Sequence, residues 1–247
     1  MPRWFLVLAI VASCSKGSSR ESVRIAAAAN TEKAFGEVGK AYTAKTGIEP
    51  IFTFGSSGLL AKQIEQGAPF FLFASASKDF ADRAIESTKC DKGTLVPYAR
   101  GKLVVWVAKG RAAPKQLAEL ADPAWQKIGI ANPEHAPFGK AAQQALEHLG
   151  VWDRIKDKVV YGENVESTLQ YAQTRNVDAA IVAQSLAVVN DGGSFLPVEP
   201  GLHDPLDQYL VVCGTGPEAQ AARGFAAFLA SSDGREILTR YGFALPQ

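Results

Sequence analysis

The chain has 247 residues, 47% of them hydrophobic, and its 26 basic and 25 acidic side chains leave a formal net charge of +1. A chain of this length can bury a sizeable core, as one large domain or as two lobes. The near-neutral charge argues against nucleic acid or an acidic membrane surface as the main partner, because both are recognised through an excess of positive charge.

The first residues predict export. After a basic start, the apolar run from Trp4 to Ala12 is too short to span a bilayer, which takes about 20 residues. The segment Val11-Ala12-Ser13-Cys14 resembles the lipobox of bacterial lipoproteins, in which the cysteine becomes the first residue and carries lipid. We therefore expect a signal peptide over residues 1–13, a lipid on Cys14 and a polar tether over residues 14–22. A plain secretory signal is the alternative.

Strands and helices alternate through the first hundred residues. Apolar runs predict strands, and amphipathic spacing predicts a helix after each of them. The expected strands cover residues 23–29, 48–54 and 70–74. Gly47 and Gly67 stand where the first two helices should end, and Ser77 is placed to cap the third. This alternation predicts a parallel sheet flanked by helices.

Ser56 and Ser57 lie where the second expected strand gives way to a short helix. Free backbone N–H groups, two hydroxyls and the positive end of a helix dipole converge at such a point, which favours an anion. The alternative is that one of the serines only caps the helix.

The alternation restarts after residues 103–108, the strongest strand pattern of the chain. Further strands are expected at 128–131, 159–161, 179–183 and 207–213, and the last one leads into helices that reach residue 243. Two α/β units in a chain of this length predict two lobes with a ligand cleft between them. The strand-to-helix junctions are rich in Ser, Asn, Thr and Gly and have almost no Lys or Arg.

Motifs for catalysis, nucleotide binding and metal binding are missing from the sequence. It contains no phosphate-binding loop of the NTPase type, and Leu59 occupies the place of the last glycine of a nucleophile elbow. The three histidines, His135, His148 and His203, lack zinc-site spacing. We therefore expect neither an enzyme nor a resident cofactor, and we expect His135 to order its own proline-rich loop.

Two cysteines remain besides Cys14. Cys90 and Cys213 could pair in an exported protein. Nothing local places them together, however, and Cys213 ends an apolar run in which a buried, unpaired cysteine is the expected state.

Several segments together resemble the substrate-binding proteins of bacterial molybdate ABC transporters, over roughly residues 23–243. The most specific segments, which occur in the same order and spacing, are 27–30, 54–58, 63–69, 132–139, 149–152, 163–165 and 240–243. The resemblance implies a two-lobed periplasmic binding protein whose chain crosses between the lobes twice. One lobe would comprise residues 22–100 and 206–247, and the other residues 101–205.

In that family, hydroxyls and backbone N–H groups at helix N-termini hold the oxyanion without a cationic side chain. The resemblance implies that Asn30 and Ser57 donate from the first lobe, and that Phe138 and Val165 offer backbone N–H groups from the second. The full set of implied oxyanion-binding residues is Asn30, Ser56, Ser57, Phe138, Val165 and Ala183.

The sequence departs from the family pattern at several of its positions. Ala183 stands where some members have a tyrosine, so no hydroxyl can donate there. Phe71 and Ser77 stand where many relatives have aspartate. We expect these two differences to affect the local packing, and the closure of the lobes or their docking, more than anion binding itself.

The resemblance implies capture of molybdate or tungstate outside the cytoplasmic membrane, in the periplasm or cell envelope, and delivery to an ABC permease. The implied partners are the small oxyanion, the permease and, through a lipid anchor, the membrane. The chain itself is expected to be a monomer. Two alternatives stay open: another tetrahedral oxyanion such as sulfate or phosphate, and a sensor that binds an anion to signal.

Overall fold

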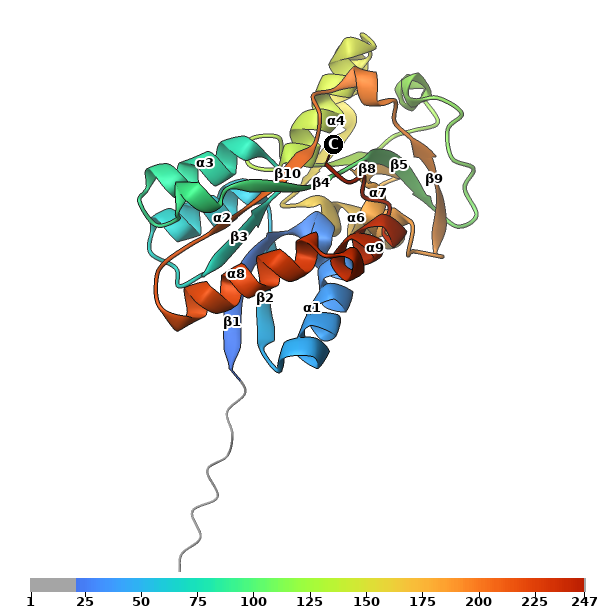
Figure 1. The fold of residues 1–247 in the computed structure, drawn as a ribbon. Coiled ribbons are helices and arrows are strands. Elements are labelled where there is room, and N and C mark those ends of the chain that lie inside the picture. Colours follow the sequence, from blue (N-terminus) through green and yellow to red (C-terminus); the bar gives the residue numbers. More distant parts are fainter. Residues whose placement is uncertain (1–20, 247) are drawn as a thin grey trace, which may run out of the picture.

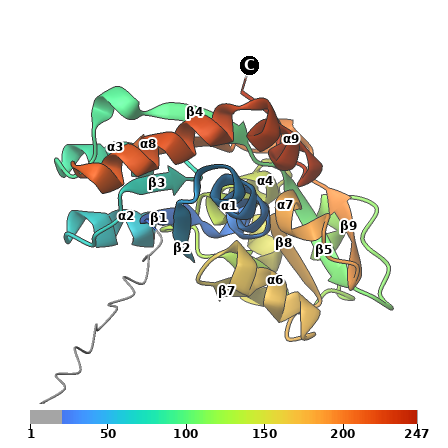
Figure 2. The same ribbon diagram turned by 60° about the horizontal axis from the view of Figure 1, so that its bottom comes forward.

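The computed structural model describes residues 21–246, which form two lobes (Figure 1). Each lobe has one five-stranded sheet that is covered by helices. Figure 2 shows α6 and α7 with β5, β8 and β9 on one side, and α2, α3 and α8 with β1 to β3 on the other. The predicted two-lobed α/β fold is therefore confirmed. Within residues 21–246, no helix has the length and apolar character needed to cross a bilayer.

The sheet of the first lobe has the strand order β2-β1-β3-β10-β4. Its strands are β1 (Ser22–Ala28), β2 (Glu49–Gly55), β3 (Leu72–Ser75), β4 (Val96–Arg100) and β10 (Asp207–Val212). β1 runs parallel to β2 and β3, whereas β10 runs antiparallel to β3 and β4. The helices of this lobe are α1 (Glu32–Thr46), α2 (Ser57–Glu65), α3 (Lys78–Glu86), α8 (Pro217–Ala230) and α9 (Ser232–Arg240).

Alternate residues of β1 enter different cores, because successive side chains of a strand point to opposite faces of the sheet. Val23 and Ile25 pack in one cluster with Phe35 of α1 and Phe225 of α8. Ala26 faces the other side, in a cluster with side chains of α2 and α3. Helices thus cover both faces of the sheet, and the carboxyl ends of β1 and β2 remain at one edge.

The sheet of the second lobe has the strand order β7-β6-β8-β5-β9. Its strands are β5 (Leu103–Ala108), β6 (Ile128–Ala131), β7 (Val159–Gly162), β8 (Ala179–Ala183) and β9 (Gly193–Pro197). β6 runs parallel to β7 and β8, and β5 runs antiparallel to β8 and β9. The helices are α4 (Pro137–His148), α5 (Trp152–Ile155), α6 (Val165–Gln173) and α7 (Gln184–Ala187).

Five short 3₁₀ helices complete the described chain: η1 (Ala29–Thr31), η2 (Lys92–Thr94), η3 (Leu117–Ala121), η4 (Lys156–Lys158) and η5 (Pro200–Leu202). The sequence pattern missed two strands, β4 and β9. Both are edge strands of their sheets, and each contains a proline, which weakens the apolar alternation that identifies a strand.

The two segments that pass between the lobes lie side by side. Gly101 follows β4 and Leu206 precedes β10, and the Gly101 N–H donates to the Leu206 carbonyl over 2.9 Å. A Cβ at Gly101 would lie 2.6 Å from Cζ of Phe138. The crossing therefore has no room for a larger residue, and it brings the first lobe against the start of α4.

Cys90 and Cys213 form a disulfide, so the expectation that Cys213 is unpaired is wrong. The two residues face each other in an isolated antiparallel bridge, at a separation of 123 residues in the sequence. Local sequence carries no sign of this pairing, because it depends on β10 returning to the first lobe after the whole of the second lobe has been built.

The disulfide should contribute measurably to stability. Closing so long a loop removes conformational entropy from the unfolded chain, and such bonds typically stabilise by about 2–4 kcal/mol. We expect a reductant to lower the midpoint of thermal unfolding. A variant that carries both Cys90→Ser and Cys213→Ser should unfold at the same temperature with and without reductant. An unchanged midpoint in the reduced wild-type chain would contradict this expectation.

Candidate functional site

A small cavity lies between the two lobes. Its volume is about 10 Å³, which is close to the space that one water molecule needs. None of its lining residues in the described chain carries a charge. They come from the end of β1 and η1, the junction of β2 with α2, Ala76, and the starts of α4 and α6: Ala28, Ala29, Asn30, Gly55, Ser56, Ala76, Ala136, Pro137, Phe138 and Val165.

The structure brings together four of the six residues that the family resemblance implied for the site. Asn30, Ser56, Phe138 and Val165 all line the cavity and are buried. Ser57 lies directly beside it, as the first residue of α2. The sixth residue, Ala183, lies away from the lining: it pairs with Leu103 in the second sheet and is fully buried in the core of that lobe.

Ser56 and Ser57 do not cap α2 with their side chains. Ser56 occupies the N-cap position without a capping hydrogen bond, and its Oγ lies 2.8 Å from Nδ1 of His135. Oγ of Ser57 accepts a hydrogen bond of 2.9 Å from the N–H of Ala76. A hydroxyl that accepts one bond keeps its own proton to donate. The Ser57 hydroxyl is therefore available as a donor, and the alternative that it only caps the helix is wrong.

Two helices of the second lobe begin at the cavity. Val165 is the first residue of α6, and Phe138 is the second residue of α4, after Pro137. The Asn164 side chain accepts from the N–H groups of the next two residues of α6, at 3.0 Å each. The Val165 and Phe138 N–H groups have no hydrogen-bond partner within residues 21–246. Free N–H groups and the positive end of a helix dipole both favour an anion here.

Asn30 is held by residues that sequence reasoning missed. Its Nδ2 donates to Oε1 of Gln208 over 3.1 Å, and Gln208 also accepts from the Tyr98 hydroxyl over 2.8 Å. Gln208 lies in β10 and is fully buried. The one signal that could have indicated it is an amide next to an apolar strand pattern. Its partner stands 178 residues earlier, so the pairing itself was not predictable.

Hydrogen bonds join the two lobes across the cavity. The His135 carbonyl accepts from the Gly58 N–H over 2.9 Å, and the Ser185 hydroxyl donates to the Asn30 carbonyl over 2.7 Å. The Ser56–His135 contact is a third such link. Besides the role expected for it in its own loop, His135 therefore also links the two lobes. No carboxylate bonds to the His135 ring in the part of the chain that the structure describes.

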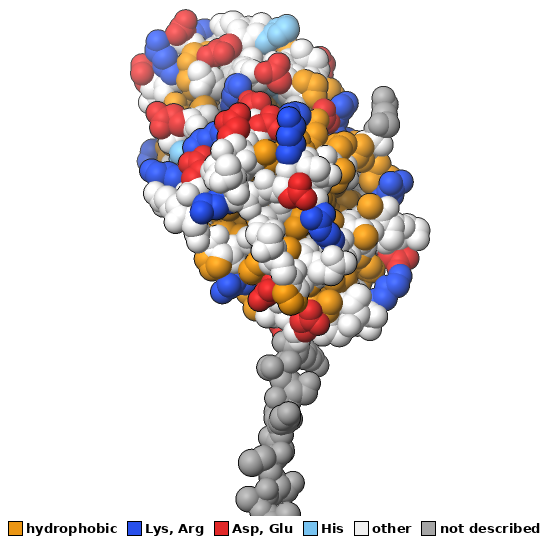
Figure 3. Space-filling view, turned by 60° about the vertical axis from the view of Figure 1, so that its left-hand side comes forward, with side chains coloured by type: hydrophobic (Ala, Val, Ile, Leu, Met, Phe, Trp, Pro, Cys, Tyr) orange, Lys and Arg blue, Asp and Glu red, His pale blue; other side chains and the backbone are white. Residues whose placement is uncertain are grey.

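The charged residues near the cavity come from both lobes. Burial, together with the charge of Glu32, raises the pKa of the Glu166 carboxyl above its usual value, and Lys33 partly opposes this shift. Lys62 and Lys140 are both exposed and do not belong to the lining. Figure 3 shows acidic and basic side chains interspersed over one face of the protein, without a large region of one sign. The residues that line the cavity therefore offer no cationic side chain to attract an anion.

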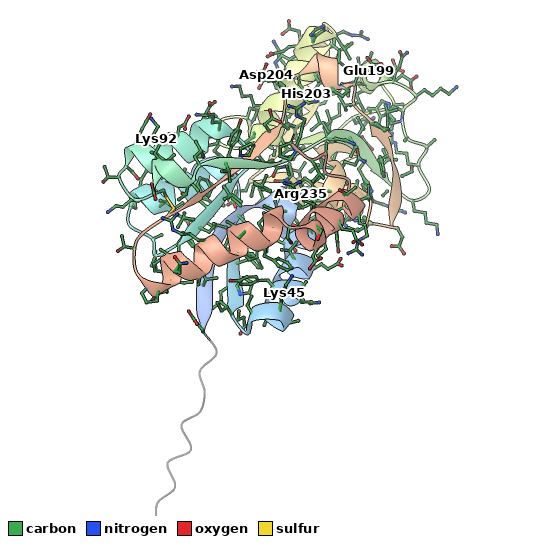
Figure 4. The ribbon with its side chains drawn as sticks, viewed as in Figure 1. Lys45, Lys92, Glu199, His203, Asp204 and Arg235 are labelled. Carbon is green, nitrogen blue, oxygen red and sulfur yellow. A yellow bond between two sulfur atoms is a disulfide. The ribbon has the colours of Figure 1, made fainter. Side chains whose placement is uncertain are left out.

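The remaining histidines and unusual positions lie outside the lining. His203 lies with Glu199 and Asp204 at the outer end of the second lobe (Figure 4). The described residues contain no group of three or more side chains that could hold a metal ion.

Ser77 precedes α3, as expected, but makes no capping bond with its side chain, so that prediction is wrong. The Phe71 ring lies under Arg24, 6.0 Å from its guanidinium carbon.

Comparison with known proteins identifies the relatives of this chain. The family described as bacterial extracellular solute-binding proteins matches residues 23–244. The molybdate-binding protein ModA of Rhodobacter capsulatus is 34% identical over 236 residues, which cover 96% of this chain and 93% of that protein. The putative ABC transporter substrate-binding lipoprotein YvgL of Bacillus subtilis is 30% identical over 243 residues, which cover 95% and 93%.

Solved structures share the fold. The periplasmic molybdate-binding protein of Azotobacter vinelandii matches with a TM-score of 0.86 at 27% identity, covering 91% of this chain and all of that chain. The sulfate-binding protein SubI of Mycobacterium tuberculosis matches with a TM-score of 0.77 at 16% identity, covering 90% and 86%. At that identity the second match shows a common fold only.

Proposed function

The chain belongs to the bacterial extracellular solute-binding protein family, and on that basis we propose that it binds molybdate or tungstate outside the cytoplasmic membrane and delivers the anion to an ABC permease. The observation that carries this proposal is the cavity between the lobes. Neutral donors from both lobes surround it, and no charged side chain lines it in the described chain. Proteins named for molybdate are among the relatives in both sequence and structure.

The donors fit a tetrahedral oxyanion because they converge from different directions. Asn30 and Ser57 belong to the first lobe, and the free N–H groups of Phe138 and Val165 to the second. Each hydrogen bond to a charged group contributes about 1.5–3 kcal/mol, so several of them can replace a cationic side chain. The N–H groups among these donors can donate a hydrogen bond but cannot accept one, so they also favour a fully ionised oxyanion over a protonated one.

Binding requires motion of the lobes. An oxyanion is larger than the single water that a 10 Å³ cavity admits, and hydrogen bonds between the lobes hold the walls of the cavity together. The lobes must therefore separate to admit the anion and close again around it. Because the donors of both lobes meet only in the closed form, the anion binds that form better and increases its population.

Titration calorimetry with four anions tests the proposal. Molybdate and tungstate are nearly equal in size and charge, so we expect both to bind, and sulfate and phosphate to bind more weakly or not at all. Tight binding of sulfate or phosphate alone would favour the alternative oxyanion. An absence of binding by all four anions would contradict the proposed function.

Glu166 should make anion binding depend on pH. Its pKa is raised in the closed form, so its ionised carboxylate opposes closure, whereas its protonated form does not. The free-energy cost of closing the lobes over an ionised Glu166 is absent below the ordinary pKa of about 4.5 and complete above the raised pKa. The affinity for the anion should therefore fall as the pH rises from the ordinary pKa to the raised one. We expect Glu166→Gln to bind molybdate several-fold more tightly at pH 7. The ratio of wild-type to variant affinity, measured at each pH, cancels the titration of the anion. A ratio that does not change with pH would contradict this role.

The protein should be anchored to a membrane through Cys14. This residue and the signal peptide lie outside the described residues, so the anchor rests on the lipobox-like segment and on one relative that is named a lipoprotein. We expect the full chain, expressed in a bacterium, to fractionate with membranes and to incorporate labelled fatty acid. Cys14→Ala should abolish the labelling. Labelling that survives this change would rule out Cys14 as the lipid site.

The remaining parts of the proposal concern partners and chemistry. The permease is the partner that receives the anion, and the protein works as a monomer tethered near it. Molybdenum enters only as oxyanion cargo, without a resident cofactor. The role is binding and not catalysis, so incubation with molybdate or phosphate esters should leave both unchanged.

A further inference from the structure

Two buried amides beside the cavity form one connected unit with a buried tyrosine. Nδ2 of Asn30 donates to Oε1 of Gln208, and the Tyr98 hydroxyl donates to the same oxygen. All three residues are buried, and Gln208 has no exposed surface. The other atom of each amide is left over: Oδ1 of Asn30 and Nε2 of Gln208 are buried without a hydrogen-bond partner in the described chain. Buried polar atoms without partners are uncommon and costly.

In this arrangement the Nδ2 group of Asn30 is directed to Gln208, and the atom left without a partner is the carbonyl Oδ1. A fully ionised oxyanion only accepts hydrogen bonds, so the carbonyl oxygen of Asn30 would repel it, whereas the Nδ2 group would bind it. Rotating the Asn30 amide alone would set its Oδ1 against Oε1 of Gln208, oxygen against oxygen. The Nδ2 group has two hydrogens, and Gln208 engages one of them. Asn30 can therefore turn both hydrogens to the cavity only if Gln208 rotates as well.

When both amides rotate, Nε2 of Gln208 donates to Oδ1 of Asn30, and the Tyr98 hydroxyl changes from a donor to an acceptor. Both hydrogens on Nδ2 of Asn30 are then free to donate to the anion. The two atoms that had no partner, Oδ1 of Asn30 and Nε2 of Gln208, each gain one, and Oε1 of Gln208 gives up the two bonds that it accepted. Gln208 has little room to move during this change, because its amide lies against Gly101. A Cβ added at Gly101 would lie 2.9 Å from Nε2 of Gln208 and 2.6 Å from Cζ of Phe138.

We propose that Gln208, held by Tyr98, is the positioning residue that turns the Asn30 amide so that its Nδ2 group donates to the bound oxyanion. The inference rests on the proposed function and adds two residues that act on Asn30 without touching the anion. Residues of β10 and β4, which are far in the sequence from the anion-binding helices, would then control the Nδ2 donor of Asn30.

A double-mutant cycle with molybdate tests this inference. Gln208→Met keeps the side-chain length and removes the donor to Asn30, so Oδ1 of Asn30 would stay unpaired whenever Nδ2 binds the anion. We expect it to weaken binding about tenfold. Asn30→Ser removes the amide but keeps a hydroxyl donor. In that background, Gln208→Met should change the affinity by less than twofold, because no amide remains to be positioned.

A second pair of variants separates positioning from packing. Tyr98→Phe removes the hydroxyl that holds Gln208 and should weaken binding several-fold in the wild-type background but not beside Asn30→Ser. Tyr42→Phe is its matched control: Tyr42 is also buried in the first lobe, and its hydroxyl donates to the Ala221 carbonyl in the core, away from the cavity. We expect Tyr42→Phe to leave the affinity unchanged.

The side-chain amide signals in ¹H–¹⁵N spectra give a readout that packing alone would not move. The Asn30 signals, identified by their loss in Asn30→Ser, should shift when molybdate is added to the wild-type chain and shift much less in Gln208→Met. Equal effects of Gln208→Met in both backgrounds, or no effect on affinity, would overturn the inference while the wild-type chain still binds molybdate. If the wild-type chain binds no oxyanion, the proposed function itself fails.

Discussion

Gly58→Ala is expected to weaken molybdate binding on the order of a hundredfold while leaving each lobe folded. A Cβ at this position would lie 2.8–2.9 Å from Cβ, Cα and the carbonyl oxygen of His135, which belongs to the other lobe. Backbone atoms cannot move aside as a flexible side chain can. The methyl group would therefore hold the lobes apart and lengthen the Gly58–His135 hydrogen bond. Overpacking costs about 1–3 kcal/mol, and each 1.4 kcal/mol is a tenfold change in affinity.

Small-angle scattering and titration together check this expectation. The radius of gyration of the wild-type chain should be smaller with saturating molybdate than without it, and that of Gly58→Ala should change less. Gly36→Ala is the matched control, because Gly36 is an exposed glycine in α1 and a Cβ there would meet no atom within 4 Å. It should bind molybdate as the wild-type chain does. Wild-type affinity in Gly58→Ala would show that closure at His135 is not needed for binding.

Ser57→Ala is expected to weaken molybdate binding by roughly ten- to a hundredfold. The change removes one donor to a charged ligand, which contributes about 1.5–3 kcal/mol. It also removes the hydroxyl that accepts a hydrogen bond from the Ala76 N–H, and leaves that N–H without its partner. Asn30→Ala should cost a similar factor, because it removes the only side-chain amide that lines the cavity in the described chain.

Calorimetry measures the affinity, and thermal unfolding of the anion-free variants provides the control. If Ser57 acts on the anion, the loss of affinity should greatly exceed any change in the unfolding midpoint. Ser56→Ala is an informative comparison, since Ser56 lines the cavity but its hydroxyl contacts His135. An affinity of Ser57→Ala within twofold of the wild type would remove this hydroxyl from the site.

The sequence was sufficient for the alternation of strands and helices and for the helix N-termini of the site. Patterns such as the apolar run at residues 103–108 and Gly47 after α1 act locally, through burial and backbone conformation, and the structure bears them out. The junctions that begin α2, α4 and α6 were identifiable for the same reason. Each one combines the end of a strand with small polar residues or a proline before an amphipathic helix.

The sequence was not sufficient for contacts that depend on how the lobes meet. The Cys90–Cys213 bond, the Gln208–Asn30 hydrogen bond and the link from His135 to Ser56 join residues that lie 79 to 178 positions apart. Each of them forms only after the chain has crossed between the lobes. Local patterns contain no information on such pairs, which is why the network behind Asn30 and the contacts that close the cleft were not predicted.

The central claim is that neutral donors at helix N-termini, and not cationic side chains, hold the anion. Lys62 and Lys140 lie in the helices that begin at the cavity, but both are exposed. The most direct test is a molybdate titration of the wild type, Ser57→Ala, Lys62→Ala and Lys140→Ala at low and at moderate salt. We expect each lysine change to alter the affinity by less than about threefold, and salt to have little effect, because buried contacts are weakly screened. A lysine change that costs more than Ser57→Ala, or an affinity that falls steeply with salt, would contradict the claim.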